Sequence, residues 1–156
     1  MNLKELRKEK KMTQQQVADL VGICLRSYKS YENEERKKGT IKYEYIFEKL
    51  EEVNKIDEEH GILELDDIKT KCTEIFERHN VYYCYLFGSY AKGYAKGNSD
   101  VDLLISTDIT GLHYFGLIEE LRVSLKKKVD LLNLKSLENN FELTKEILQD
   151  GVKVYG

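Results

Sequence analysis

Apolar side chains recur at two different spacings along the chain. Through the first 53 residues they lie three or four positions apart, which is the repeat of a helix with one buried face. Beyond residue 64 this helical spacing alternates with short runs of aromatic and branched apolar residues that favour strands. We therefore expect a small all-helical bundle followed by an α/β or α+β domain.

The expected elements follow from these patterns. Helices are predicted at about residues 3–11, 13–21, 24–33, 43–53, 65–76, 112–125 and 137–149. Strands are predicted at residues 81–87, 100–105, 128–132 and 152–155. The long gap between the second and third strands has room for a crossover helix, although one sequence does not fix the strand order.

A polar segment divides the two patterns. Residues 54–64 are mostly charged or polar and contain a lone Gly61, as is typical of loops and linkers. We therefore expect a first domain at residues 1–56, a linker at 57–64 and a second domain at 65–156.

Composition restricts the class of protein. No stretch of the 156 residues approaches the ~20 consecutive apolar residues of a membrane helix. The N-terminus runs straight into charged residues without the apolar core of a signal peptide, so we expect a cytoplasmic protein with no membrane contact. Three scattered cysteines suggest neither a disulfide framework nor a zinc site, and we expect Cys24, Cys72 and Cys84 to be small buried side chains.

Charge is distributed unevenly. Residues 1–40 carry ten Lys and Arg against six Asp and Glu, whereas residues 57–156 carry twelve against eighteen. Any contact with nucleic acid should therefore lie near the start of the chain.

Two short predicted helices meet at a glycine turn in this basic part. Thr13 and Gln16 have the spacing of a capping box, and Gly22 stands where a helix end needs a positive φ. The segment LRKEKKMTQQQVADLVGICLRSYKSYENEERKKG closely resembles the repressor-like, XRE-type helix-turn-helix family over residues 3 to about 53. The resemblance implies binding to operator DNA, and a homodimer is favoured because such domains usually read two half-sites. It assigns the DNA-contacting positions to Gln14, Leu25, Arg26, Ser27, Lys29 and Ser30.

These positions have different expected roles within the resemblance. Gln14 is expected to contact a phosphate and to brace the recognition helix, while Arg26 and Lys29 face the major groove. Leu25 departs from the polar residue that is common in the family, so it either contacts a thymine methyl group or packs. Glu32 falls where the family places a structural residue. The alternative for Arg26 and Lys29 is a solvated helix face.

The strongest chemical signal is LFGSYAKGYAKGNSDVDLLI, residues 86–105. A predicted strand ends at Gly88 and Ser89, and backbone N–H groups at such a helix start, with the serine hydroxyl, are suited to the β and γ phosphates of a nucleoside triphosphate. Asp100 and Asp102 lie two residues apart on the next predicted strand, so their carboxylates share one face. Adjacent carboxylates attract Mg²⁺ and can hold a metal pair ~4 Å apart.

This stretch, with KKKVDLL and the ending ILQDGVKVYG, resembles the minimal nucleotidyltransferases of the DNA polymerase β superfamily over residues 66–156. The resemblance implies an α/β fold with a mixed sheet, Mg-ATP as substrate, two Mg²⁺ ions, and transfer of a nucleoside monophosphate to an acceptor hydroxyl with release of pyrophosphate. It makes Asp130 the third carboxylate, as general base or metal ligand; the alternative for Asp130 is a surface residue. The implied catalytic and metal-binding residues are Asp100, Asp102 and Asp130, and the implied nucleotide-binding residues are Gly88, Ser89 and Lys92.

The resemblance also implies a biological role. This family includes antitoxins that adenylylate a HEPN-domain ribonuclease toxin encoded beside them, and the chain is similar to such an antitoxin with a repressor-like domain in front. It would transfer AMP to a tyrosine hydroxyl of a HEPN-type toxin and repress its own operon. Two alternatives stay open: a nucleotide-sensing transcriptional regulator without turnover, and a nucleotidyltransferase acting on a small molecule such as an aminoglycoside. Clustered carboxylates disfavour the first because they repel one another, and the short chain disfavours the second.

Overall fold

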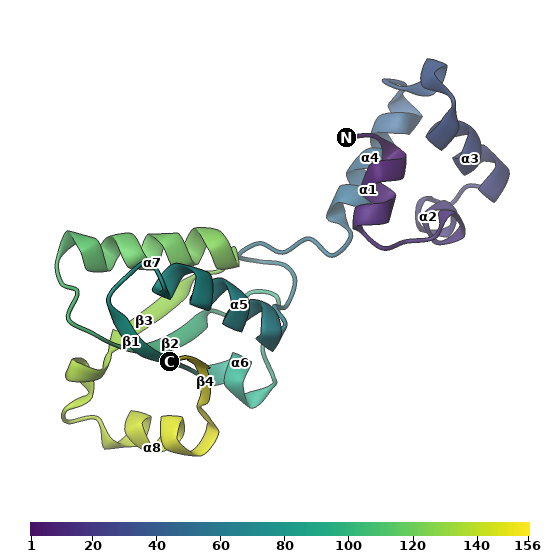
Figure 1. The fold of residues 1–156 in the computed structure, drawn as a ribbon. Coiled ribbons are helices and arrows are strands. Elements are labelled where there is room, and N and C mark those ends of the chain that lie inside the picture. Colours follow the sequence, from purple (N-terminus) through teal and green to yellow (C-terminus); the bar gives the residue numbers. More distant parts are fainter. The chain divides into compact units, whose positions relative to one another are not determined.

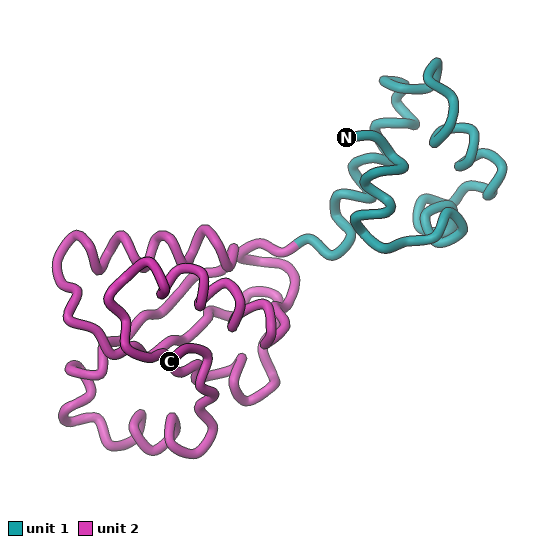
Figure 2. Tube along the Cα trace, in the orientation of Figure 1, with its two compact units in different colours: residues 1–55 teal, residues 56–156 magenta.

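The computed structural model describes all residues from Met1 to Gly156 and divides into two compact units. The first unit comprises Met1–Lys55 and the second Ile56–Gly156 (Figures 1 and 2). The first is helical, and the second contains a sheet covered by helices. This confirms the predicted fold class.

The first unit is a bundle of short helices. Its elements are α1 (Leu3–Glu9), α2 (Gln14–Val21), α3 (Leu25–Asn33), the 3-10 helix η1 (Glu35–Lys37) and α4 (Ile41–Glu52). Each α-helix contributes a fully or nearly fully buried side chain to one core, and these include Leu6, Val17, Tyr28 and Leu50. The apolar residues at helical spacing in the sequence are thus the residues that hold this bundle together.

Local signals set the turn between α2 and α3. The Thr13 hydroxyl accepts a hydrogen bond from the N–H of Gln16, and the Gln16 side chain accepts one from the N–H of Thr13. Gly22 ends α2 in the left-handed region, with φ 71°. The capping box and the glycine turn expected from the sequence are both present, so short-range interactions fix where α2 begins and ends.

The second unit alternates helices and strands. Its elements are α5 (Leu65–Phe76), β1 (Val81–Phe87), α6 (Gly88–Lys92), β2 (Val101–Thr107), α7 (Leu112–Leu125), β3 (Val129–Asn133), the 3-10 helix η2 (Leu134–Leu137), α8 (Phe141–Asp150) and β4 (Val152–Tyr155). The longest helix, α7, has 14 residues, and no helix is long and apolar enough to cross a membrane.

The four strands form one mixed sheet in the order β3-β2-β1-β4. β1 pairs antiparallel with β2 and with β4, whereas β2 and β3 run parallel. The crossover between the two parallel strands is α7, in the gap where the sequence leaves room for one.

Helices cover both faces of this sheet (Figure 1). α5 and α7 pack on one face over a core that includes Cys84, Leu103 and Leu121, none of which has any exposed surface. α8 lies against the other face, where Ile147 packs on Phe87. Because side chains alternate along a strand, residues next to the core positions of β2 and β3 face α8.

The last helix begins later than the sequence predicts. The pattern places its start at residue 137, but Leu134–Leu137 form the 3-10 helix η2 and α8 starts at Phe141. The reason is a local cap: the Asn140 side chain accepts a hydrogen bond from the N–H of Leu143 at 3.1 Å.

The expectation for the cysteines is wrong at one position. Cys72 and Cys84 are buried, but Cys24 is exposed. Cys24 precedes α3 as its N-cap residue, and its Sγ lies 3.2 Å from the Ser27 hydroxyl. A helix start at the surface keeps this side chain out of the core.

The segment that the sequence predicts to be a linker packs against the second unit. Leu63 is 4% exposed and belongs to the core beneath α5 and α7, and Ile56 packs against the same core. Residues 56–64 therefore cover part of the α/β unit.

Candidate functional site

Three carboxylates lie near the start of the two parallel strands. Asp102 on β2 pairs in register with Asp130 on β3, and Asp100 directly precedes β2. Val101 and Leu103 are fully buried on the side of α5 and α7, so the alternation of the strand turns Asp102 toward α8. Its in-register partner Asp130 faces the same way. The structure thus brings residues from two separate motifs onto one face of the sheet.

The electrostatics of this face oppose a negative charge at Asp102. The pKa of Asp102 is raised to about 6, first by burial and then by the negative charges of Asp130, Asp100 and Glu146. Asp100 and Asp130 are exposed. A divalent cation relieves such repulsion, and hard carboxylate oxygens are the ligands that Mg²⁺ prefers. The donor set therefore fits a magnesium ion.

The carboxylates do not form a closed metal cage. No three His, Cys, Asp or Glu side chains of the protein converge on one point that could hold a metal ion. Mg²⁺ is usually bound by one or two carboxylates, with water and substrate phosphates completing its shell. The three aspartates are thus candidate ligands for a cation that arrives with a triphosphate.

The loop expected to hold phosphate begins directly against Asp102. β1 ends at Phe87, and α6 begins at Gly88 with φ 70°. A Cβ on Gly88 would lie 2.1 Å from Asp102 Oδ2, far inside any normal contact. Glycine is therefore required for both its backbone conformation and its lack of a side chain. Ser89 follows Gly88, so the first turn of α6 lies next to the face of the sheet that carries Asp102 and Asp130.

Lys92, expected to hold triphosphate, forms an ion pair with α8. Its Nζ lies 2.7 Å from Glu146 Oε1, and this hydrogen bond raises the pKa of Lys92. Glu146 lies on α8, which packs against the face of the sheet that carries Asp102, and its charge also raises the pKa of Asp102. The sequence analysis missed Glu146 because it lies in an ordinary amphipathic helix, outside every motif, and only the packing of α8 brings it there.

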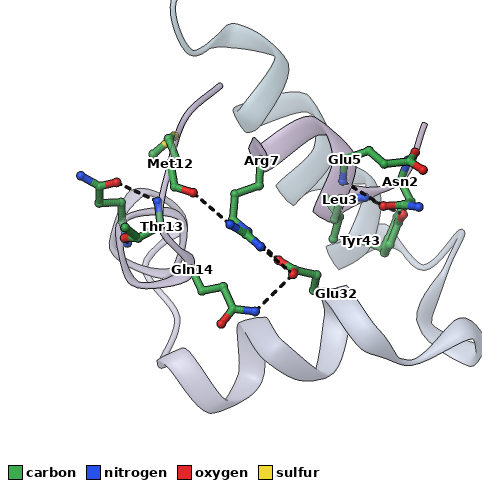
Figure 3. Close-up of polar contacts among 10 residues, drawn as sticks. Asn2, Leu3, Glu5, Arg7, Met12, Thr13, Gln14, Glu32 and Tyr43 are labelled. Atoms are coloured by element: carbon green, nitrogen blue, oxygen red, sulfur yellow. Dashed lines mark hydrogen bonds and ion pairs between the residues drawn. The ribbon is translucent and has the colours of Figure 1, made fainter. Parts of the chain in front are cut away.

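In the first unit, a buried ion pair braces α3 (Figure 3). Arg7 on α1 donates two hydrogen bonds to the Glu32 carboxylate, at 2.8 and 3.0 Å. Gln14 on α2 donates a third at 3.2 Å. Burial alone would raise the pKa of Glu32, but these hydrogen bonds hold it below its usual value. Three side chains thus tie α3 to α1 and α2, and Gln14 braces α3 as the resemblance implies.

The predicted DNA-contacting residues of α3 differ in exposure. Those that are exposed are Arg26 and Lys29, and those that are half-buried are Leu25, Ser27 and Ser30. The Ser30 hydroxyl is already engaged, because it donates to Glu34 and accepts from Lys37. Arg26 and Lys29 are therefore the side chains best placed to meet another molecule.

Comparison with known families identifies the two units. Residues 3–41 match a helix-turn-helix family, and residues 70–156 match the polymerase beta nucleotidyltransferase family. The chain belongs to the polymerase beta nucleotidyltransferase family. In this nucleotidyltransferase the matched segment contains the three aspartates of the sheet (the carboxylate face) and the loop that begins at Gly88 (the glycine loop). The helix-turn-helix match contains α2 and α3.

Curated relatives of this nucleotidyltransferase are named protein adenylyltransferases. Protein adenylyltransferase MntA of Thermococcus cleftensis is 36% identical over 100 residues, covering 60% of this chain and 99% of the relative. A Methanocaldococcus jannaschii relative, provisionally named a protein adenylyltransferase, is 34% identical over 96 residues, covering 58% of this chain and 95% of the relative. A chain in a solved complex of a tri-AMPylated Shewanella oneidensis HEPN toxin with an MNT antitoxin is 20% identical, with a TM-score of 0.46, covering 60% of this chain and 73% of that chain.

Proposed function

We propose that this nucleotidyltransferase is an antitoxin that transfers AMP from Mg-ATP to a tyrosine hydroxyl of a HEPN-type ribonuclease toxin and thereby neutralises it. The observation that carries the chemistry is the in-register pairing of Asp102 with Asp130, directly against Gly88. A protein acceptor is supported by the names of the curated relatives. The tyrosine and the toxin class rest on the family resemblance of the sequence.

Asp100, Asp102 and Asp130 would hold the magnesium ions. A bound cation supplies positive charge that neutralises the phosphates and stabilises the attacking and leaving oxygens. The backbone of Gly88 and Ser89, with the Ser89 hydroxyl, binds the β and γ phosphates. Lys92 adds a point charge once the triphosphate competes with Glu146 for its ammonium group.

The transfer exchanges one phosphorus–oxygen bond for another. The acceptor hydroxyl oxygen bonds to the α-phosphorus of ATP while the bond from that phosphorus to the oxygen bridging to the β phosphate breaks. Pyrophosphate leaves with the bridging oxygen. The hydroxyl proton passes to the carboxylate of Asp130, which is exposed and thus open to an incoming side chain.

Labelled transfer tests the proposal. The full chain is mixed with Mg²⁺, ATP labelled in its α phosphate and the product of the neighbouring gene. The wild type should label that product, and Asp100→Asn should lower the rate by about 100-fold, roughly 3 kcal/mol of transition-state stabilisation. The control is Asp108→Asn, an exposed aspartate paired with Lys135, which should transfer normally. An unlabelled product with the wild type contradicts the proposed function, and full activity of Asp100→Asn removes Asp100 from the site.

The same assay distinguishes the alternatives. Label on an added aminoglycoside, with none on protein, would make the acceptor a small molecule. ATP binding without any labelled product would make the second unit a nucleotide sensor.

We also propose that the helix-turn-helix unit binds operator DNA and regulates its own operon. The proposal is supported by the family match of residues 3–41 and by the exposed Arg26 and Lys29 on a braced α3. Gln14 uses one of its two amide N–H groups on Glu32, which leaves one for a phosphate.

Binding to an operator fragment tests this second proposal. Arg26→Ala and Lys29→Ala should each weaken binding about 10-fold, as expected for the loss of one base or phosphate contact. Lys49→Ala, which removes a lysine paired with Glu52 on α4, should bind normally. Sedimentation with and without the fragment tests the proposed homodimer. Equal binding by all three variants would remove α3 from the recognition surface.

A further inference from the structure

Lys127 stands apart from every other charged residue because it has no exposed surface. Its ammonium donates hydrogen bonds to the backbone carbonyls of His60 at 3.0 Å and Gly61 at 2.7 Å, and also to that of Gly97. An ammonium has three N–H groups, so its hydrogen-bonding capacity is fully used. The Lys127 side chain thus joins two chain segments that are distant in sequence.

This arrangement is specific to the middle lysine of its run. Lys126 and Lys128 are exposed, so Lys127 is the one lysine of the three whose charge is removed from water, which is energetically unfavourable. Burial lowers the pKa of Lys127, while the charges of Asp57 and Glu59 favour its charged form. Three carbonyl oxygens and the negative charges of Asp57 and Glu59 offset the free-energy cost of burying the ammonium.

The segments held by Lys127 lead to the carboxylate face. Gly97 lies in the loop between α6 and β2, and a Cβ there would be 3.0 Å from the Glu59 carbonyl, so residues 59–61 pack tightly on this loop. The N–H of Val101 donates to the carbonyl of Lys128 at 2.9 Å. These contacts therefore hold the loop before β2 next to the turn before β3.

Each residue of the Lys127–Gly97 hydrogen bond lies the same number of positions before an aspartate. Gly97 lies three residues before Asp100, and Lys127 lies three residues before Asp130. The hydrogen bond between Lys127 and Gly97 thus crosses between the two segments that carry the carboxylates just before they become paired strands. Metal ligands must be held within about 0.5 Å of their productive positions.

We propose that Lys127 is a positioning residue of the nucleotidyl-transfer site, which sets the separation of Asp100 and Asp102 from Asp130 and thereby the affinity for the divalent cation. This inference rests on the proposed function in taking those aspartates as the metal ligands. The hydrogen bonds of the Lys127 ammonium go to three backbone carbonyls and to none of the aspartates, so Lys127 acts through the loop that it anchors.

Direct metal binding tests the inference without relying on turnover. Mn²⁺ alone is titrated into the full chain and followed by its electron paramagnetic resonance signal, at a temperature where circular dichroism shows each variant folded. Lys127→Met removes the ammonium and keeps most of the side-chain volume. It should weaken Mn²⁺ binding about 10-fold or more, as the loss of outer positioning contacts does at metal sites. Asp102→Asn reports the loss expected when a ligand is removed.

Two further variants separate positioning from stability. Leu121→Ala removes a buried core side chain of α7 that takes no part in the hydrogen bonds of Lys127, so it should lower stability and leave the Mn²⁺ affinity equal to that of the wild type. Gly97→Ala places a methyl group 3.0 Å from the Glu59 carbonyl, so residues 59–61 must shift by a few tenths of an ångström, and Mn²⁺ binding should weaken in the same direction as in Lys127→Met even if the latter does not fold.

Each outcome bears on the inference. Wild-type Mn²⁺ affinity in Lys127→Met or Gly97→Ala overturns it, as does an equal loss in Leu121→Ala or a wild type that binds no Mn²⁺. Normal AMP transfer with unchanged Mn²⁺ affinity in Lys127→Met refutes the inference and leaves the proposed function intact. A wild type that binds Mn²⁺ without labelling any acceptor, together with weakened Lys127→Met, refutes the proposed function and supports the inference.

Discussion

Gly88 and Asp102 approach each other so closely that a Cβ on the glycine would lie 2.1 Å from the Oδ2 atom of the aspartate. The first residue of α6 and the central carboxylate of β2 are therefore in contact through backbone and side chain. A displacement of the backbone at Gly88 toward β2 must displace Asp102 as well. The proposed phosphate-binding loop and the proposed metal ligand Asp102 therefore constrain each other's position.

Gly88→Ala should abolish AMP transfer, with a loss of about 100-fold or more, because the new methyl group pushes Asp102 aside. The matched control is Gly93→Ala. Gly93 also has a positive φ, 82° against 70° for Gly88, but a Cβ there meets nothing within 4 Å. Both variants should lose about 1 kcal/mol of stability from backbone strain, measured by urea unfolding. Similar transfer rates in the two variants would show that strain, and not the contact with Asp102, matters.

Asp102→Asn should stabilise the metal-free protein at alkaline pH. The folded-state pKa of Asp102 is about 6, above the ~4 of an unfolded chain. The folded state therefore binds the proton more tightly, and the free energy of unfolding of the wild type falls as pH rises from about 4 through 6. In the presence of a chelator, the variant should be about 1–3 kcal/mol more stable than the wild type at pH 8, with the difference shrinking toward pH 4.

The control for this pH dependence is Asp108→Asn. A hydrogen bond from Lys135 lowers the pKa of the exposed Asp108, so its removal should give no gain in stability at pH 8. Urea unfolding at several pH values checks both variants. A stability difference for Asp102→Asn that does not change with pH would contradict the electrostatic explanation.

Removing the Glu32 charge should destabilise the helical unit. The Glu32 side chain is 1% exposed and that of Arg7 13%, so Glu32→Gln leaves a guanidinium buried without its counter-charge, a change that costs about 3–5 kcal/mol. Thermal unfolding followed by circular dichroism should show the helical unit melting first. Arg36→Met breaks the exposed pair with Glu34 and should leave the melting temperature unchanged.

Glu146→Gln should strengthen ATP binding. The substitution releases Lys92 from its 2.7 Å ion pair and removes one negative charge beside Asp102. We expect the dissociation constant for Mg-ATP to fall about two- to five-fold, the range of an ion pair that is still partly exposed to solvent. Calorimetric titration measures this effect, with Glu138→Gln as an exposed control outside the site. Weaker binding in Glu146→Gln would mean that the ion pair helps to hold Lys92 in its binding position.

Local patterns sufficed for most elements of the fold. The strand 81–87 and the helix 112–125 have the bounds that the sequence predicts, because apolar runs stop at Gly88 and begin after Gly111. The start of α8 was misplaced because the 3-10 turn before it has the same apolar spacing as a helix. The mixed sheet was expected only from the family resemblance, since strand order depends on contacts distant in sequence.

The residues of the candidate site also differ in how far the sequence alone reveals them. Gly88, Asp100 and Asp102 were recognisable from one short motif, and Asp130 from its match to the family. Glu146 and Lys127 were not, because a lone acid in a helix and a lysine within a lysine run carry no local signal. Their partners lie far away in sequence: Lys127 bonds to carbonyls 67 and 30 residues distant. Such residues become visible only once the chain is folded.

The turn that joins α7 to β3 limits which insertions and deletions the protein can accept. It passes through Lys126, in the left-handed region with φ 56°, and delivers Val129 to its place opposite Val101. Losing one residue in this turn would shift the register of β3 by one position, so that Asp130 would face the core under α7 and Leu131 would pair with Asp102; gaining one residue would pair Val129 with Asp102 instead. The chain should therefore tolerate substitution of the exposed Lys128 far better than any insertion or deletion between α7 and β3.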